Sequence, residues 1–343
     1  MLKKQRINAL LIIVSIIVAC SMAQGCDNTR NSGKGVDVPM KSHYIGRFVI
    51  AVPTDMKPAV LTASLRYVKI DEILWPRDIV HEQARNAEWN KFMAHINELS
   101  PPIHTDKVVL RIEDFHGVCN WARGIFYHKN GDAADEATWS MLADTGMIAL
   151  WLKGDSTLVE YEFSSNRMAD NIKNILRNYN ARNVKNFVGQ QLGNNFYLQH
   201  GRINLPYLEQ EESYARFEGH PLSLVLEIKM EMDVGYHRET VGLIEKTKGM
   251  LVQAAIEPGI SISKIRLDKR QVAGMKGEEA ILRMSDKDKT TYMFIWEFNG
   301  REDSGEYPTT TIEMESPDGN RDEKIKIWDA VLDSMKPMFV RKK

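Results

Sequence analysis

Hydrophobic and polar residues alternate most regularly over residues 222–233. Side chains along a β-strand point to opposite faces in turn, so this alternation predicts a strand with one buried face. Ser223, Val225, Glu227, Lys229, Glu231 and Asp233 fall on the opposite face. The apolar positions are Leu222, Leu224, Leu226, Ile228, Met230 and Met232.

Shorter runs of β-branched and aromatic residues predict further strands in both halves of the chain. Residues 147–152 and 157–163 flank Lys153-Gly154-Asp155-Ser156, a polar, glycine-containing segment that favours a hairpin turn between two strands. The other predicted strands cover residues 45–52, 63–70, 108–112, 118–127, 262–267, 278–284, 291–298 and 309–315.

Apolar residues at helical spacing predict four helices, and proline-containing segments at 100–102, 258–259 and 337 end three of them. The first helix is expected between residues 78 and 99. The apolar sets are Trp89, Phe92, Met93, Ile96 and Leu99; Met168, Ile172, Ile175, Leu176 and Tyr179; Val241, Ile244, Leu251 and Ala255; and Ile325, Trp328, Val331, Leu332 and Met335.

Each half of the chain therefore contains strands, a helix, several antiparallel strands and a terminal helix. This order predicts an α+β fold with two tandem domains, each an antiparallel sheet with helices packed on one face. The expected N-terminal domain covers residues 43–190 and the C-terminal domain covers residues 191–343. The duplication rests on the order of elements and not on residue identity.

The first 25 residues have the features of a lipoprotein-type signal peptide. Lys3, Lys4 and Arg6 precede an uncharged apolar run over residues 7–19. Cys20 and Cys26 each follow a small residue, so either is a candidate lipidation site. The run is shorter than the roughly 20 apolar residues of a spanning helix, although an uncleaved signal anchor is the alternative. Residues 26–42 are expected to form a flexible tether.

Composition and charge exclude some classes of function. The 343 residues carry 45 basic and 46 acidic side chains, a formal net charge of −1, whereas nucleic-acid binding requires clustered Lys and Arg. We therefore expect no nucleic-acid partner. Cys119 is the one cysteine beyond the signal region, and we interpret it as a small buried apolar residue and not as a nucleophile.

The sequence contains none of the motifs that commonly indicate catalysis. No nucleophile elbow, zinc-protease helix, phosphate-binding loop or dinucleotide-binding turn occurs, so we predict no catalytic residues, no metal and no cofactor. Three acidic segments, at residues 132–136, 209–212 and 286–289, are interpreted as solvated surface.

A polar segment between two apolar strands is the candidate partner-binding loop. Binding residues often lie on loops that a rigid scaffold holds, and Tyr and Arg are frequent interface anchors. A purely structural hairpin loop is the equal alternative. The candidate contacts are Arg301, Glu302, Asp303, Glu306 and Tyr307.

Several segments between roughly residues 44 and 338 carry motifs of a known family. The most specific block is Ala273-Gly274-Met275-Lys276-Gly277-Glu278-Glu279. Others are Gly46-Arg47-Phe48-Val49-Ile50-Ala51-Val52-Pro53, Asn195-Phe196-Tyr197-Leu198-Gln199-His200-Gly201-Arg202-Ile203, Phe294-Ile295-Trp296-Glu297-Phe298-Asn299-Gly300 and Trp328-Asp329-Ala330-Val331-Leu332-Asp333-Ser334-Met335. Together these segments resemble family four of the type VI secretion immunity proteins that neutralise lipase effectors. The chain departs from this family at Tyr197, where a cysteine is often found.

The resemblance implies a periplasmic immunity protein that binds a cognate lipase or phospholipase effector and blocks its active site or its lid. Such a binder needs no catalytic residue, and an N-terminal lipid would anchor it to the membrane. Two alternatives remain open: an envelope lipoprotein with a structural or ligand-binding role and no toxin partner, and an enzyme that uses Cys119 or dispersed acidic residues.

Overall fold

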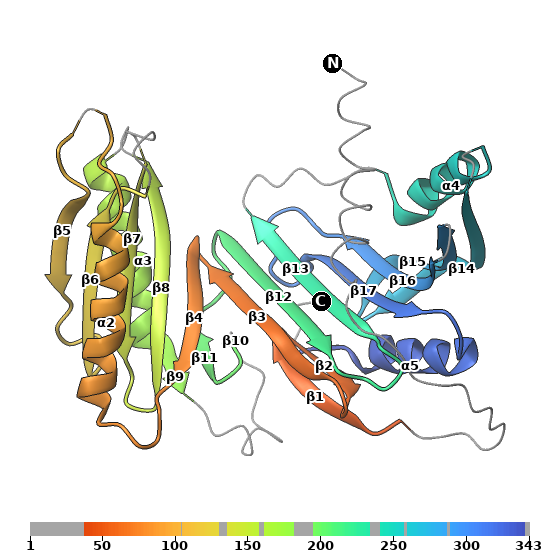
Figure 1. The fold of residues 1–343 in the computed structure, drawn as a ribbon, viewed down its shortest axis with the longest axis horizontal. Coiled ribbons are helices and arrows are strands. Elements are labelled where there is room, and N and C mark those ends of the chain that lie inside the picture. Colours follow the sequence, from red (N-terminus) through yellow and green to blue (C-terminus); the bar gives the residue numbers. More distant parts are fainter. Residues whose placement is uncertain are drawn as a thin grey trace. The chain divides into compact units, whose positions relative to one another are not determined.

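The computed structural model describes residues 38–103, 105–129, 136–157, 161–181, 195–233, 241–256, 259–286 and 289–339. Within these residues, the fold is α+β and contains four helices, one twelve-stranded antiparallel sheet and two three-stranded sheets (Figure 1). The expected fold class is thus confirmed. The signal peptide with Cys20 and Cys26, and residues 183–194 at the predicted domain join, lie outside the described residues.

The large sheet has the order β14-β15-β16-β17-β13-β12-β3-β4-β8-β7-β6-β5. Its strands are β3 (Lys57–Leu65), β4 (Val68–Leu74), β5 (Val109–Asp114), β6 (Trp121–Tyr127), β7 (Glu136–Asp144), β8 (Ile148–Thr157), β12 (Gln210–Glu218), β13 (Val225–Asp233), β14 (Ile260–Val272), β15 (Met275–Asp286), β16 (Lys289–Asn299) and β17 (Thr309–Pro317).

The remaining elements are two small sheets and four helices. One sheet combines β1 (Met40–Ile45), β2 (Phe48–Pro53) and β18 (Lys336–Pro337), and the other combines β9 (Tyr179–Ala181), β10 (Asn195–Tyr197) and β11 (Gly201–Asn204). The helices are α2 (His81–Asn97), α3 (Tyr161–Asn178), α4 (Leu243–Ala254) and α5 (Arg321–Ser334).

The regular alternation in the sequence produces β13, as predicted. Leu226, Ile228 and Met230 are buried on one face of this strand, which pairs with β12 on one side and β17 on the other. The four predicted helices also form, although α4 buries Leu243 and Thr247, whereas Val241 and Ala255 of its predicted apolar set are exposed. In α5, in contrast, Ile327, Trp328, Val331 and Leu332 are all buried.

Helices α2 and α3 cover opposite faces of the sheet around β6, β7 and β8 (Figure 1). Trp89 of α2 packs in a cluster with Ala149, whereas Ile172 of α3 packs in another with Leu150 and Leu152. Our prediction that helices cover one face is therefore wrong for this region. β8 is apolar on both faces, and both must be covered to be removed from water.

The predicted hairpin turn at residues 153–156 is also wrong, because β8 continues through this segment. Gly154 pairs with Val68 on one side and Trp139 on the other. A Cβ atom at position 154 would lie 2.1 Å from the Met168 sulfur, so glycine here permits close packing of α3 against the strand.

The strand predicted at residues 45–52 forms as β2 from Phe48 onward, whereas the strand predicted at residues 63–70 is instead a hairpin. Gly46, at φ +55°, separates β1 from β2, and Arg66 and Tyr67, at φ +53° and +64°, separate β3 from β4. Consecutive residues with positive φ form the tight turn that matches the twist of two antiparallel strands. Neither Arg66 nor Tyr67 is a typical turn residue, so the sequence contains no clear signal for the second turn.

The large sheet contains strands from both predicted domains. β12 of the C-terminal half pairs with β3 of the N-terminal half over eight residue pairs. The first hairpin packs against the last helix, since the Ser334 hydroxyl accepts a 2.8 Å hydrogen bond from the Ala51 N–H. The boundary between residues 190 and 191 stays a prediction.

A buried ion pair joins the first hairpin to β12. The Arg47 guanidinium donates to both carboxylate oxygens of Glu211, at 3.0 and 2.7 Å from Nε, and its Nη2 donates to the Leu205 carbonyl at 2.9 Å. Only 7% of Arg47 and 8% of Glu211 are exposed. Glu211 is therefore not part of the solvated surface predicted for residues 209–212.

Replacing Arg47 should destabilise the protein strongly. In Arg47→Met, Glu211 stays buried without its partner, and we expect the free energy of unfolding to fall by about 3–5 kcal/mol. Urea denaturation measures this change. The control Arg123→Met breaks the exposed Arg123–Asp114 pair and should cost at most about 1 kcal/mol. Similar losses in both variants would contradict a special role for the buried pair.

Glu313 of β17 lies among other carboxylates. It is directly opposite Glu227 on β13, and burial, followed by the charges of Glu227, Glu297 and Glu315, raises its pKa to about 7. The folded state therefore holds this proton at a pH where the unfolded chain has released it. Stability should fall as pH rises from about 4.5 to 7.

Glu313→Gln should remove this pH-dependent loss, because glutamine has no charge to bury. We expect the variant to exceed the wild type in unfolding free energy at pH 8, by roughly 1–3 kcal/mol, and to show little gain at pH 4.5. Denaturant titrations at both pH values test this. The exposed Glu302→Gln serves as control, and an equal gain at both pH values would contradict the assignment.

Candidate protein-binding site

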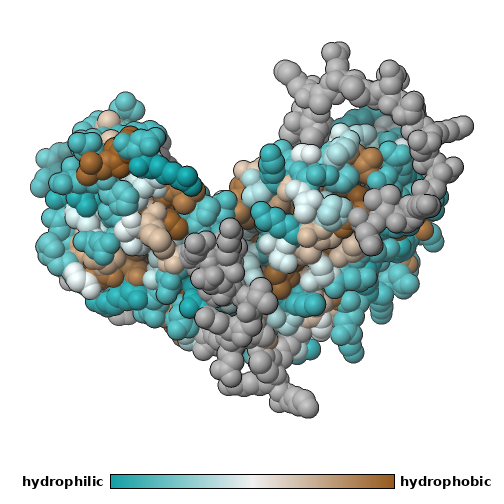
Figure 2. Space-filling view, turned by 90° about the horizontal axis from the view of Figure 1, so that it is seen from below, coloured by the Kyte–Doolittle hydropathy of each residue, from teal (hydrophilic) through white to brown (hydrophobic). Residues whose placement is uncertain are grey.

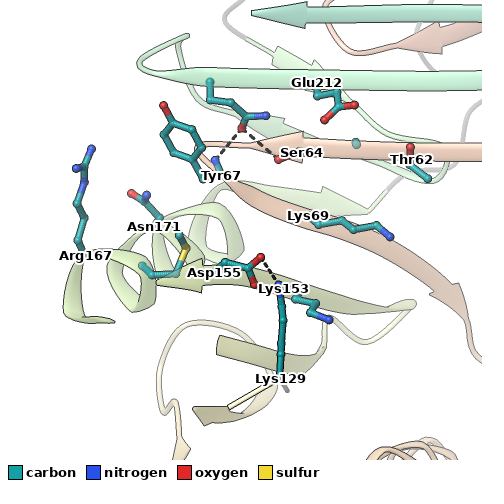
Figure 3. Close-up of a pocket in the computed structure, with 13 residues that line it drawn as sticks. Thr62, Ser64, Tyr67, Lys69, Lys129, Lys153, Asp155, Arg167, Asn171 and Glu212 are labelled. Carbon is teal, nitrogen blue, oxygen red and sulfur yellow. Dashed lines mark hydrogen bonds and ion pairs between the residues drawn. The ribbon is translucent and has the colours of Figure 1, made fainter. Parts of the chain in front are cut away.

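A polar pocket of about 770 Å³ lies beside β3, β4, β8, β12 and α3 (Figure 3). Its walls combine residues from strands that are adjacent in the sheet but far apart in the chain. The lining residues are Thr62, Ala63, Ser64, Tyr67, Lys69, Lys129, Lys153, Asp155, Arg167, Met168, Asn171, Gln210 and Glu212.

The pocket opens where β3 and β4 diverge. These two strands pair over only three positions, from Ala63–Ile70 to Leu65–Val68. In contrast, β3 pairs with β12 over eight positions and β4 pairs with β8 over seven. Thr62, Ser64 and Lys69 lie at or beside this short connection and face the pocket.

Hydrogen bonds fix the turn at one end of the pocket. The Gln210 side-chain carbonyl accepts from the Ser64 hydroxyl at 3.1 Å and from the Tyr67 backbone N–H at 2.7 Å. On the other side of the turn, the Asn171 amide donates to the Arg66 carbonyl at 3.2 Å. The left-handed turn is thereby held between β12 and α3.

Basic side chains dominate the β4 and β8 side of the pocket (Figure 3). Lys69 is directly opposite Lys153, and Lys129 forms an ion pair with Asp155. Burial lowers the pKa of Lys153, and the charges of Lys129 and Lys69 lower it further. At the far edge, Arg167 pairs with Glu209.

The lining of the pocket is suited to recognition of a polar partner. The pocket lining contains neither a histidine nor a cysteine, and among the described residues no group of His, Cys, Asp and Glu is arranged to hold a metal ion. Small-molecule sites are mainly apolar, whereas most residues of this lining are polar or charged, so the pocket fits a polar segment of a protein.

Cys119 shows no feature of an activated nucleophile. It is partly buried, and its thiol donates a hydrogen bond to the Trp121 carbonyl at 3.1 Å. Burial raises the pKa of the thiol, which disfavours the reactive thiolate.

The predicted partner-binding loop is ordered by contacts within it. The Arg301 guanidinium lies 3.6 Å from the centre of the Tyr307 ring, and the Arg301 backbone N–H donates to the Tyr307 carbonyl at 2.9 Å. Glu302 and Asp303 are exposed, and Glu306 is half-buried. None of the five predicted residues lines the pocket, so the loop and the pocket are separate candidate surfaces.

One face of the molecule is mainly hydrophilic (Figure 2). On the face shown in Figure 2, hydrophobic residues form small groups among hydrophilic ones. Within the part of the chain that the structure describes, no helix has the length and apolar character needed to cross a membrane. A partner that docks on this face would therefore meet mostly polar side chains.

Sequence reasoning missed the pocket residues. Lys153 and Asp155 fall in the segment that we predicted to be a turn, and Glu212 falls in a run predicted to be solvated surface. Lys69 and Lys129 have no distinguishing local motif. Only the strand order shows that these side chains converge, since neighbouring positions in the sheet come from distant parts of the chain.

Three solved structures have a similar fold. The apo structure of the immunity protein TplEi of the type VI secretion system (T6SS) from Pseudomonas aeruginosa aligns at a TM-score of 0.70 and 19% identity, over 88% of this chain and 98% of that chain. A chain from the crystal structure of a Tle4–Tli4 complex gives the same four values. TplEi from P. aeruginosa in complex with an "L" peptide aligns at 0.65 and 18% identity, over 88% and 99%.

The sequence comparisons identify the family of the C-terminal region. No curated protein sequence matches the chain. Residues 196–338 match the family described as the Tle cognate immunity protein 4 C-terminal domain. Over residues 196–338, the chain is therefore similar to the C-terminal domain of the Tle cognate immunity protein 4 family, a domain of immunity proteins and not of enzymes.

Proposed function

We propose that this protein binds and neutralises a Tle4-type lipase effector of a type VI secretion system in the periplasm, by blocking the active site of the lipase or the motion of its lid. The family match over residues 196–338 carries the proposal. The similarity in fold to the structure from a Tle4–Tli4 complex supports it, because the alignment covers 98% of that chain.

The described surface is consistent with inhibition by binding. An inhibitor of this kind needs polar and aromatic residues that contact the lipase, and it needs no catalytic residues of its own. The polar pocket and the loop with Arg301 and Tyr307 both provide such contacts. Tight inhibition requires an extensive interface, and we expect one of about 1,600 Å² or more.

We further propose that the protein is an exported lipoprotein, anchored through Cys20 or Cys26. The basic residues and the short apolar run at the N-terminus support export. A lipid anchor would hold the inhibitor at the membrane whose lipids the effector attacks. Mass spectrometry of the mature N-terminus distinguishes the two cysteines, and a free amine at Gln24 would contradict lipidation.

Co-expression tests the proposed function directly. We expect the full chain to restore the growth of cells that express a Tle4-type lipase in the periplasm, to co-purify with it and to inhibit hydrolysis of a lipid substrate. A catalytically inactive lipase should still co-purify with the protein, which separates binding from survival. Failure to bind or protect across a panel of Tle4-type lipases would refute the proposal.

The loop residues should contribute unequally to the complex. Tyr307 is half-buried beneath Arg301, whereas Glu302 is exposed. Buried aromatic anchors control dissociation, and charges at the rim mainly change association. Tyr307→Ala should therefore raise the dissociation rate by about tenfold or more, and Glu302→Ala should change it little.

Surface plasmon resonance with the lipase measures both rates, and Tyr307→Phe is the matched control because it keeps the ring. If deletion of residues 301–307 changes neither affinity nor protection, the loop is not part of the interface. The immunity function would then depend on another surface.

A further inference from the structure

Two lysines face each other at the polar pocket. Lys69 on β4 and Lys153 on β8 are directly opposite in the antiparallel ladder, and both line the pocket (Figure 3). The Cβ atoms of opposite residues in such a pair lie about 5 Å apart, and like charges placed there destabilise the sheet. The arrangement therefore weakens the isolated protein.

Neighbouring carboxylates offset this repulsion only in part. Among the described residues, Lys153 has no ion pair, and the nearest carboxylate to Lys69 is that of Asp71, at 3.9 Å between two exposed side chains. Asp155 and Glu209 are already paired with Lys129 and Arg167. The two ammonium groups are thus available for a negatively charged partner.

The opposite wall of the pocket has a different character. Glu212 of β12 faces the pocket together with the polar side chains of Thr62 and Ser64 (Figure 3). A ligand with negative charge throughout would meet Glu212 as well as the lysines. A peptide segment fits both walls better, because it can direct an acidic side chain to one wall and hydrogen-bond donors to the other.

We infer that Lys69 and Lys153 bind an acidic side chain on a segment of the lipase effector, which enters this pocket. The inference rests on the proposed function and assigns a second contact surface, distinct from the loop at residues 301–307. The like-charge repulsion in the free protein is relieved when a carboxylate lies between the two ammonium groups. Binding is therefore favoured at the expense of the stability of the unbound inhibitor.

Charge reversal at one lysine separates binding from folding. Lys69→Glu places a carboxylate opposite Lys153, so the variant should be at least as stable as the wild type in thermal unfolding. The same change should weaken binding to the lipase by about tenfold or more, because the incoming carboxylate now meets a negative charge. A purely structural role for Lys69 does not predict stabilisation together with weaker binding.

The measurement is the affinity of full-length protein for a Tle4-type lipase that binds the wild type, at low and high salt. Lys153→Glu should weaken binding to a similar extent. The control variant Lys276→Glu changes an exposed lysine of β15, outside the pocket lining, and should bind like the wild type. Equal affinity in Lys69→Glu, Lys153→Glu and the wild type would overturn the inference and leave the proposed function intact.

If no Tle4-type lipase binds the wild type, the proposed function fails, and the pocket is tested with two other probes. These are a fluorescein-labelled peptide of serine and asparagine residues with one central glutamate, and vesicles of phosphatidylglycerol. Peptide binding that Lys69→Glu abolishes and Lys276→Glu does not would support recognition of an acidic segment. Vesicle binding that Lys69→Glu abolishes and Lys276→Glu does not would overturn the inference in favour of a lipid headgroup. Binding of neither probe would also overturn the inference.

Discussion

The buried contact between Arg47 and Glu211 is the constraint on which the rest of the fold depends. Removing a charged pair from water is costly, so both side chains must stay in place with their hydrogen bonds intact. Arg47 lies in the turn of the first hairpin, and Glu211 lies on β12 in the middle of the large sheet. The pair therefore requires two distant segments to meet.

Other segments converge at the same turn. Gly46 exchanges two backbone hydrogen bonds with Tyr197, at 3.1 and 2.7 Å, and the Met338 N–H donates to the Arg47 carbonyl at 2.9 Å. A Cβ atom at position 46 would lie 2.6 Å from the Ser213 hydroxyl, so only glycine permits this approach. Segments from the beginning, the middle and the end of the described chain therefore contact one another at this turn.

The large sheet is continuous, but two of its neighbouring strands pair over only a few positions. Its two halves are joined through the β3–β4 hairpin, which has three residue pairs, and the polar pocket opens beside it. The pocket is consequently lined by lysines from β4 and β8 and by polar residues from β3 and β12. Binding sites commonly accept such local costs in stability, because the groups that recognise a partner are not satisfied until the partner arrives.

The sequence alone determined the elements whose signal is local. Alternation at residues 222–233 predicted β13, helical spacing predicted α2, α3, α4 and α5, and the motifs near residues 273–300 indicated the family. Only the tertiary structure decided that Gly154 belongs to a continuous strand, that Glu211 is buried and that Lys69 faces Lys153. Periodicity reveals which face of an element is apolar, but the strand or helix that covers this face is set by pairing between distant segments.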